Sequence, residues 1–121
     1  LHSEGFAAGE LKHGPIALVE EGQPVFIIVP SKRSRNNLHA KVVSNIQEVR
    51  ARGAVTIVIA EDGDTDVEAY ADHIIRIPQS AGLMQPLLST IPLQIFASSV
   101  AEARGLNVDQ PRNLAKSVTV E

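Results

Sequence analysis

Short runs of β-branched and other apolar residues alternate with longer amphipathic segments, and this alternation constrains the fold more than any other feature of the sequence. Two of the runs are VFIIV at 25–29 and VTIVIA at 55–60, and a third is HIIRIP at 73–78. Runs of this length and composition are typical of strands, and the first two are apolar enough to lie buried on both faces of a sheet. We therefore predict three strands at these positions.

The segment between the first two strands has the periodicity of an amphipathic helix. Across 36–52 the apolar residues recur at steps of four, four and three, and Gly53 follows as a helix-ending residue; these apolar residues are Leu38, Val42, Ile46 and Val49. Strands that alternate with helices imply right-handed crossovers and a parallel sheet. The predicted fold class is α/β, with a parallel sheet flanked by helices.

A second long helix is predicted over 84–104, a segment that is apolar on nearly every side. We expect Pro92 to start or kink this helix and Gly105 to end it. A helix of this kind suits a position between the sheet and another protein surface. The apolar stretches of the chain are interrupted well short of the roughly 20 residues that a membrane span needs, so we expect no membrane partner.

Length and composition narrow the class of protein. A chain of 121 residues fits one domain, and its 11 Lys and Arg stand against 14 Asp and Glu. No basic run is interleaved with aromatic residues, so we expect no nucleic-acid partner. The absence of cysteine excludes disulfides and a cysteine nucleophile, and no secretory signal pattern is present. We expect a soluble, cytoplasmic protein, and the opening LHSEGFAAGE, without Met, suggests a domain cut from a longer polypeptide.

The acidic turn EDGDTD resembles part of a calcium-binding loop. Asp62, Asp64 and Asp66 stand at alternate positions, but the sixth and twelfth positions hold Val67 and His73 instead of Gly and Glu. We therefore predict a solvated turn.

The remaining candidates for ligand binding are scattered. His2, His39 and His73 stand singly, and no spacing pairs them with carboxylates as metal ligands, so we expect structural or surface roles and no metal. Neither GxGxxG nor GxxxxGKS/T occurs at a strand-to-helix junction, and we expect no cofactor. Four polar residues before the first long helix could bind an anion or simply cap the helix, and both interpretations remain open; these residues are Ser31, Ser34, Asn36 and Asn37.

Two basic residues could carry chemistry. A helix-like lead-in, EGFAAGE at 4–10, breaks at Gly14 and Pro15 in GELKHGP, which leaves Lys12 and His13 at the exit. The imidazole can move protons near neutral pH, or it can complement the helix dipole. Lys116 is either a solvated tail charge or an amine in a pocket, where its unprotonated form could make a Schiff base with a sugar carbonyl.

Three segments carry a family resemblance over the whole chain, in order. GELKHGP, NIQEVRARG at 45–53 and above all DQPRNLAKSVTVE at 109–121 resemble the end of the glutamine-fructose-6-phosphate aminotransferases, also called glucosamine-6-phosphate synthases. The resemblance implies that residues 1–108 form the second of two sugar isomerase (SIS) subdomains, a three-layer arrangement with a parallel sheet flanked by helices. Residues 109–121 would be the C-terminal active-site tail. The first SIS subdomain and the glutaminase domain of that family are absent from this chain.

The resemblance also implies site residues. Lys116 matches the lysine that forms a Schiff base with open-chain fructose 6-phosphate, and Ala115 matches the neighbour whose backbone contacts the sugar. His13 matches the histidine of ring opening, which in the family reaches into the adjacent subunit, so a homodimer is implied. The family's cysteine nucleophile, sugar-phosphate loop and proton-shuttling glutamate are not in this chain.

Because those parts are missing, we expect the chain to carry part of the isomerase site and not to catalyse the overall reaction alone. Two alternatives remain open. One is an SIS module that binds a sugar phosphate without chemistry, and the other is a dimerisation half whose apolar 84–104 helix covers a partner.

Overall fold

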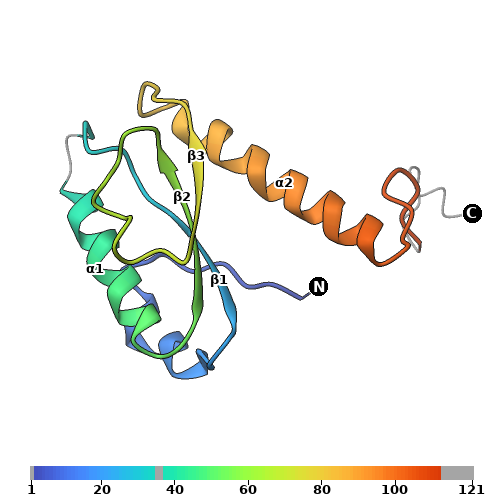
Figure 1. Ribbon diagram of the computed structural model, residues 1–121, viewed down its shortest axis with the longest axis horizontal. Helices are drawn as coiled ribbons and strands as arrows, with labels where there is room; N and C mark the ends of the chain where they lie inside the picture. Colours follow the sequence, from blue (N-terminus) through green and yellow to red (C-terminus); the bar gives the residue numbers. More distant parts are fainter. Residues whose placement is uncertain (1, 35–36, 113–121) are drawn as a thin grey trace, which may run out of the picture. The chain divides into compact units, whose positions relative to one another are not determined.

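The computed structural model describes residues 2–34 and 37–112, and its centre is a three-stranded parallel sheet (Figure 1). The strands are β1 (Pro24–Ile28), β2 (Val55–Glu61) and β3 (His73–Ile77), in the order β1-β2-β3. Both neighbouring pairs run parallel. The α/β fold class with a parallel sheet is therefore confirmed, and each strand ends within one residue of its predicted bounds.

The described residues also form two long helices. Helix α1 (Leu38–Arg50) connects β1 to β2, and α2 (Gln85–Ala103) follows β3. Both predicted helices are confirmed, although α1 ends at Arg50, and residues 35 and 36 lie outside the described residues. The chain divides into two compact units, residues 1–89 and 90–121.

The predicted helical lead-in over 4–10 is wrong. Residues 2–7 have no regular secondary structure, and turns at 8–10 lead into two short 3-10 helices, η1 (Leu11–His13) and η2 (Pro15–Leu18). Gly5 and Gly9 explain the difference, because each glycine disfavours a helix by about 1 kcal/mol relative to alanine and a segment this short is marginal in any case.

The core of the first unit lies between α1 and the sheet. Its buried side chains come from α1, from β2, and from the residues that follow β1 and β2; they are Val29, Val42, Ile46, Val58, Ala60 and Val67. The predicted apolar stripe of α1 is confirmed at its three later positions, whereas Leu38 is 45% exposed.

Strand β1 is less buried than predicted. Its residues are half-buried or exposed, and Ile28 is 45% exposed. Burial on both faces was predicted for this strand, and that prediction is wrong for β1 because it lies at an edge of the sheet as far as the described residues extend. The central strand β2 has the expected burial, with its last four residues all buried.

The buried side-chain amide of Gln85 attaches the first residue of α2 to the segment that follows β1. Gln85 donates from Nε2 to the Val29 carbonyl at 2.8 Å and accepts from the Ser31 backbone N–H at 3.1 Å. The helix ends at Ala103, just before the predicted helix-ending Gly105, whose φ of +67° accompanies a 2.9 Å bond from the Leu106 N–H to the Ala101 carbonyl. Pro92 lies inside the helix and does not start it.

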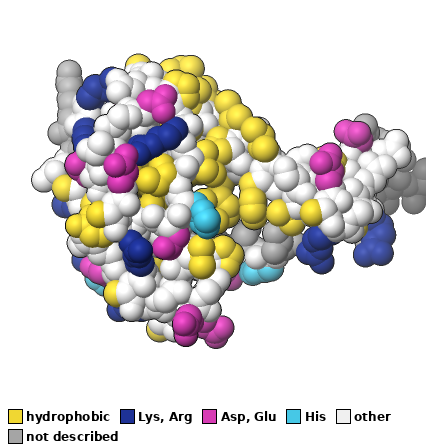
Figure 2. All heavy atoms as spheres, viewed as in Figure 1, with side chains coloured by type: hydrophobic (Ala, Val, Ile, Leu, Met, Phe, Trp, Pro, Cys, Tyr) yellow, Lys and Arg dark blue, Asp and Glu magenta, His cyan; other side chains and the backbone are white. Residues whose placement is uncertain are grey.

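Apolar side chains reach the surface along α2 (Figure 2). Leu87, Ile91 and Ile95 are 62%, 50% and 61% exposed, whereas the buried residues of this helix are the polar Gln85 and Ser89. No helix within 2–34 and 37–112 combines the length and the apolar character needed to cross a membrane.

Candidate functional site

His13 is the last residue of η1 and is exposed. Gly14 follows with φ +153°, a conformation that favours glycine, and η2 begins at Pro15. The chain therefore turns at His13, where Gly14 and Pro15 predict a break. Lys116 and Ala115 lie outside the described residues, and their roles stay predictions.

The segment around His13 is held by short-range backbone bonds. The Glu10 N–H donates to the Ala7 carbonyl at 2.8 Å, and the His13 N–H donates to the Glu10 carbonyl at 3.0 Å. After the turn, the Ala17 N–H donates to the Gly14 carbonyl at 3.0 Å. These bonds make consecutive turns, so the position of His13 follows from where the turns are attached to the rest of the molecule.

The turns are attached on both sides of His13. Upstream, Ala8 packs against the core, and Asn45 of α1 donates from Nδ2 to the Ala8 carbonyl at 3.0 Å. Downstream, Ile16 of η2 is buried. The exposed imidazole thus lies between two anchored points.

A cluster of polar residues lies where the strands end, and Glu61 is at its centre. The buried Glu61 carboxylate accepts from Ser31 Oγ at 2.8 Å, from Arg33 Nη2 at 3.1 Å and from the Ser80 backbone N–H at 3.3 Å. These partners follow β1 and β3, so one carboxylate ties together the ends of all three strands.

A separate group of ion pairs forms around the buried side chain of Asp64. Its carboxylate lies 2.7 Å from His39 Nε2 and 3.0 Å from Lys32 Nζ, and the same ammonium lies 2.9 Å from Asp66. Burial by itself would raise the pKa of Asp64, but the hydrogen bonds from His39 and Lys32 outweigh burial and hold the pKa below its ordinary value. The hydrogen bonds to Asp66 and Asp64 raise the pKa of Lys32.

The prediction of a wholly solvated acidic turn is therefore wrong. Asp62 and Asp66 are exposed, but Glu61 and Asp64 are 7% and 6% exposed. Sequence spacing missed the pairing of His39 with Asp64 because 25 residues separate them. The order of elements offered a usable signal. His39 begins the helix that follows β1 and Asp64 follows the neighbouring strand β2, and the residues after neighbouring parallel strands meet at the carboxyl edge of the sheet.

Among the described residues, His39, Asp64 and Asp66 offer ligand atoms within 4.8 Å of one another. Lys32 already contacts both carboxylates. We therefore interpret this group as an ion-pair network that connects the segment after β1, the start of α1 and the turn after β2. The expectation that no histidine binds a metal stays a prediction.

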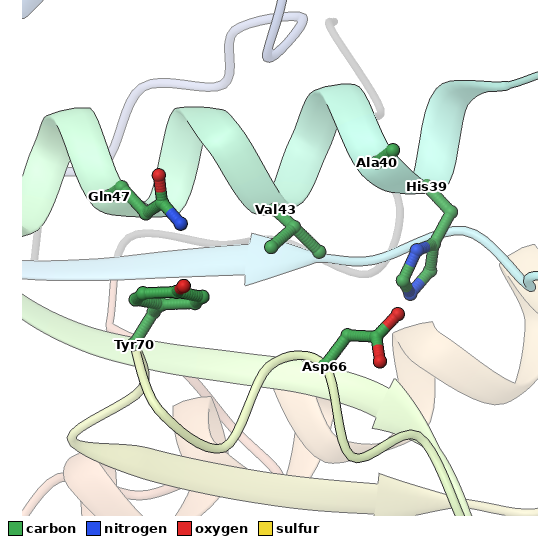
Figure 3. A pocket seen from close by; sticks show the side chains of 6 residues that line it. All are labelled: His39, Ala40, Val43, Gln47, Asp66 and Tyr70. Carbon is green, nitrogen blue, oxygen red and sulfur yellow. The ribbon is translucent and has the colours of Figure 1, made fainter.

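An open pocket of about 340 Å³ adjoins this network on α1 (Figure 3). His39 and Asp66 point toward each other at one end of the pocket, and Tyr70 lies opposite Gln47 at the other. The lining offers few polar groups that converge on one point, so we assign no catalytic role to this pocket.

Comparison with known proteins gives a consistent result. The SIS domain family matches residues 1–102. Proteins called glutamine-fructose-6-phosphate aminotransferase (isomerizing) from Corynebacterium diphtheriae and Corynebacterium glutamicum are 81% and 79% identical over all 121 residues. In both cases this chain spans 19% of the relative's length.

A solved structure agrees with the sequence relatives. It is described as the C-terminal domain of glucosamine-fructose-6-phosphate aminotransferase from Francisella tularensis, and its TM-score is 0.78 at 36% identity. The similarity covers 91% of this chain and 30% of that one. The three parallel strands, with α1 connecting β1 to β2, fit the α/β fold of the matched family. On these grounds the chain belongs to the SIS domain family.

Proposed function

We propose that this chain is the second SIS subdomain and C-terminal tail of an enzyme that makes glucosamine 6-phosphate from fructose 6-phosphate and glutamine, at the entry to hexosamine synthesis. The observation that carries the proposal is 81% identity, over all 121 residues, to a relative called glutamine-fructose-6-phosphate aminotransferase (isomerizing). The proposed boundaries are residues 1–108 for the subdomain and 109–121 for the tail.

Lys116 supplies the amine of the proposed mechanism. Its unprotonated Nζ attacks the C2 carbonyl of the open-chain sugar, and the carbinolamine loses water to give an imine. Ammonia released from glutamine then displaces the lysine, and a proton shift between C2 and C1 gives the aldose phosphate. The backbone of Ala115 contacts the sugar beside the imine.

His13 opens the sugar ring in this mechanism. As a general acid and base, it accepts the proton of the C2 hydroxyl and returns a proton to the ring oxygen, so that the ketone is released. The exposure of His13 at the end of η1 supports this role, because an exposed imidazole on a turn can contact a sugar bound by another subunit. No cofactor is needed for these steps.

The proposed assembly is a homodimer that also contains a first SIS subdomain and a glutaminase domain, in the cytoplasm. Two observations support a larger assembly. The chain spans 19% of the length of its relatives, and α2 exposes apolar side chains that would pack against another protein surface.

The test uses a chimera in which this chain replaces the matching 19% of the Corynebacterium diphtheriae relative. We expect the chimera to form glucosamine 6-phosphate from fructose 6-phosphate and glutamine. Lys116→Arg, which keeps the positive charge but provides no amine for an imine, should abolish this activity.

The alternative is an SIS module that holds a sugar phosphate without chemistry. It predicts that Lys116→Arg leaves the activity of the chimera unchanged, and that result would overturn the proposal. The isolated chain should form no glucosamine 6-phosphate in the same assay.

A further inference from the structure

We propose that Asn45 is a positioning residue for His13. Asn45 lies on α1, 32 residues away in sequence, and its amide donates a 3.0 Å hydrogen bond to the Ala8 carbonyl at the base of the turns that carry His13. The inference rests on the proposed role of His13 in opening the sugar ring, and it adds a residue that holds this imidazole in place.

The segment that carries His13 has little burial of its own. Helix η1 contains no buried residue, and His13 and its neighbour Lys12 are both exposed. Segments with few buried apolar contacts open locally at low free-energy cost. The position of η1 therefore depends on its attachments, which on the upstream side are the packing of Ala8 and the bond from Asn45.

The other end of this bond is fixed. Asn45 is half-buried on a helix whose neighbouring side chains Val42, Ile46 and Val49 are buried. A side chain on an element that is packed into the core is held more exactly than one on a loop. Asn45 thus transfers the rigidity of α1 to the Ala8 carbonyl.

Consecutive turns carry this constraint from Ala8 to the imidazole. The Ala7 carbonyl accepts from the Glu10 and Leu11 N–H groups at 2.8 and 3.2 Å, and the Glu10 carbonyl accepts from the His13 N–H at 3.0 Å. If the Asn45 bond is lost, this short ladder stays intact but is attached only through side-chain packing. A shift of about 1 Å in a reacting group can reduce a rate by as much as about 100-fold.

The chimera tests this inference with two substrates. The first is fructose 6-phosphate, which is mostly ring-closed, and the second is an acyclic analogue that lacks the 5-hydroxyl group and cannot close a furanose ring. The readout is the rate at which cyanoborohydride traps each sugar on Lys116, followed by mass spectrometry. Ring opening contributes to the first rate only.

The variants are Asn45→Ala, the isosteric Asn45→Asp, His13→Ala and a matched amide control on the same helix, Gln47→Ala. An ionised carboxylate at position 45 cannot donate to the Ala8 carbonyl, so Asn45→Asp tests the bond with little change in shape. We expect both Asn45 variants to reduce the trapping rate with fructose 6-phosphate about tenfold, which is less than the roughly 10²–10⁴-fold that a general acid-base contributes, because His13 itself is retained. Trapping of the acyclic analogue should stay within twofold of the unaltered chimera, and Gln47→Ala should change neither rate.

The possible failures are distinguishable. If Asn45 variants trap both sugars at the unaltered rate, or lose both rates equally, Asn45 has no positioning role toward ring opening and the inference is wrong. If His13→Ala leaves trapping of fructose 6-phosphate unchanged, the proposed role of His13 fails, and the inference falls with it. If His13→Ala slows only the ring-closed sugar while Asn45→Asp does not, the role of His13 stands and that of Asn45 is overturned.

Discussion

At the scale of single residues, the buried carboxylate of Asp64 connects several segments of the first unit. It contacts Lys32 after β1 and His39 at the start of α1, and its own backbone carbonyl accepts from Arg76 of β3 at 2.7 Å. A buried carboxylate costs desolvation free energy unless its oxygens are satisfied, and here they are. The turn after β2 is thereby fixed to both neighbouring strands.

Asp64→Asn should destabilise the chain by about 2 kcal/mol, because the amide keeps the shape but loses the charge that Lys32 and His39 contact. Urea denaturation followed by circular dichroism measures the free energy of unfolding. Asp62→Asn in the exposed part of the same turn is the control, and it should change stability by less than about 0.5 kcal/mol. Equal effects of the two substitutions would contradict the ion-pair network.

The same carboxylate predicts a dependence of stability on pH. Because the pKa of Asp64 is lower in the folded chain than its ordinary value, its stabilising contribution is fully present above the unfolded pKa of about 3.9 and is lost as pH falls through the folded pKa. The difference in unfolding free energy between the wild type and Asp64→Asn should therefore be present at pH 5 and shrink below about pH 4. A difference that grows as pH falls from 5 to 3 would contradict this sign.

At the scale of elements, the spacing of apolar residues along the sequence predicted the positions of the strands and long helices. Strands β1 to β3 and helices α1 and α2 all lie close to their predicted ranges. Each strand has a short β-branched run, α1 has a regular apolar stripe, and α2 is a long segment that is apolar on nearly every side. The failures have a different physical origin. The exposure of Leu38 and of β1 depends on which neighbours an element has, and local periodicity does not contain that information.

Some features of the candidate site could be predicted from the local sequence, and others depend on how the elements pack. His13 could be placed at a turn from Gly14 and Pro15 alone, since glycine and proline both interrupt a continuous helix. The contacts of Asn45 with Ala8 and of His39 with Asp64 join residues 37 and 25 positions apart, so they follow from the packing of α1 and not from any motif. The chemistry proposed for Lys116 follows from the resemblance of the terminal motif to a known family, and hydrophobic periodicity does not predict it.

The turn from α1 to β2 provides a test at this scale. Gly53 has φ +84°, and a Cβ there would lie 3.1 Å from the Cα of Glu21. Gly53→Ala should therefore lower the free energy of unfolding by about 1 to 3 kcal/mol, through backbone strain and the close contact. Gly82→Ala is the matched control, because a Cβ at Gly82 meets nothing within 4 Å, and its effect in the same urea titration should be within about 0.5 kcal/mol. If Gly53→Ala is as mild as the control, the turn tolerates a side chain and this account of it is wrong.

At the scale of the whole molecule, the exposed apolar residues of α2 predict association. Ile91 and Ile95 lie four residues apart, on one side of the helix, and both are at least half exposed. We expect the chain to self-associate in sedimentation velocity as its concentration rises, and the double substitution Ile91→Glu with Ile95→Glu to weaken that association. Ala97→Glu adds charge at an exposed position on the opposite side of the same helix and should leave association unchanged. A monomer at all concentrations would count against the dimer proposal.

The chemistry proposed for this chain is distributed over a longer polypeptide. Its relatives are about five times as long, and the sugar-phosphate loop and the glutaminase nucleophile are expected outside the 121 residues. The chain contributes an imidazole on an anchored turn and an amine in its last residues. Both residues are proposed to belong to an imine-forming site.

Borohydride trapping on the chimera tests that claim most directly. The chimera is incubated with fructose 6-phosphate and borohydride, and peptide mapping by mass spectrometry identifies the modified residue, with Lys116→Arg and the unaltered Corynebacterium diphtheriae relative alongside. We predict one sugar phosphate adduct, located on Lys116 and absent from Lys116→Arg. An adduct on another lysine, or none while the unaltered relative is labelled, would contradict the account.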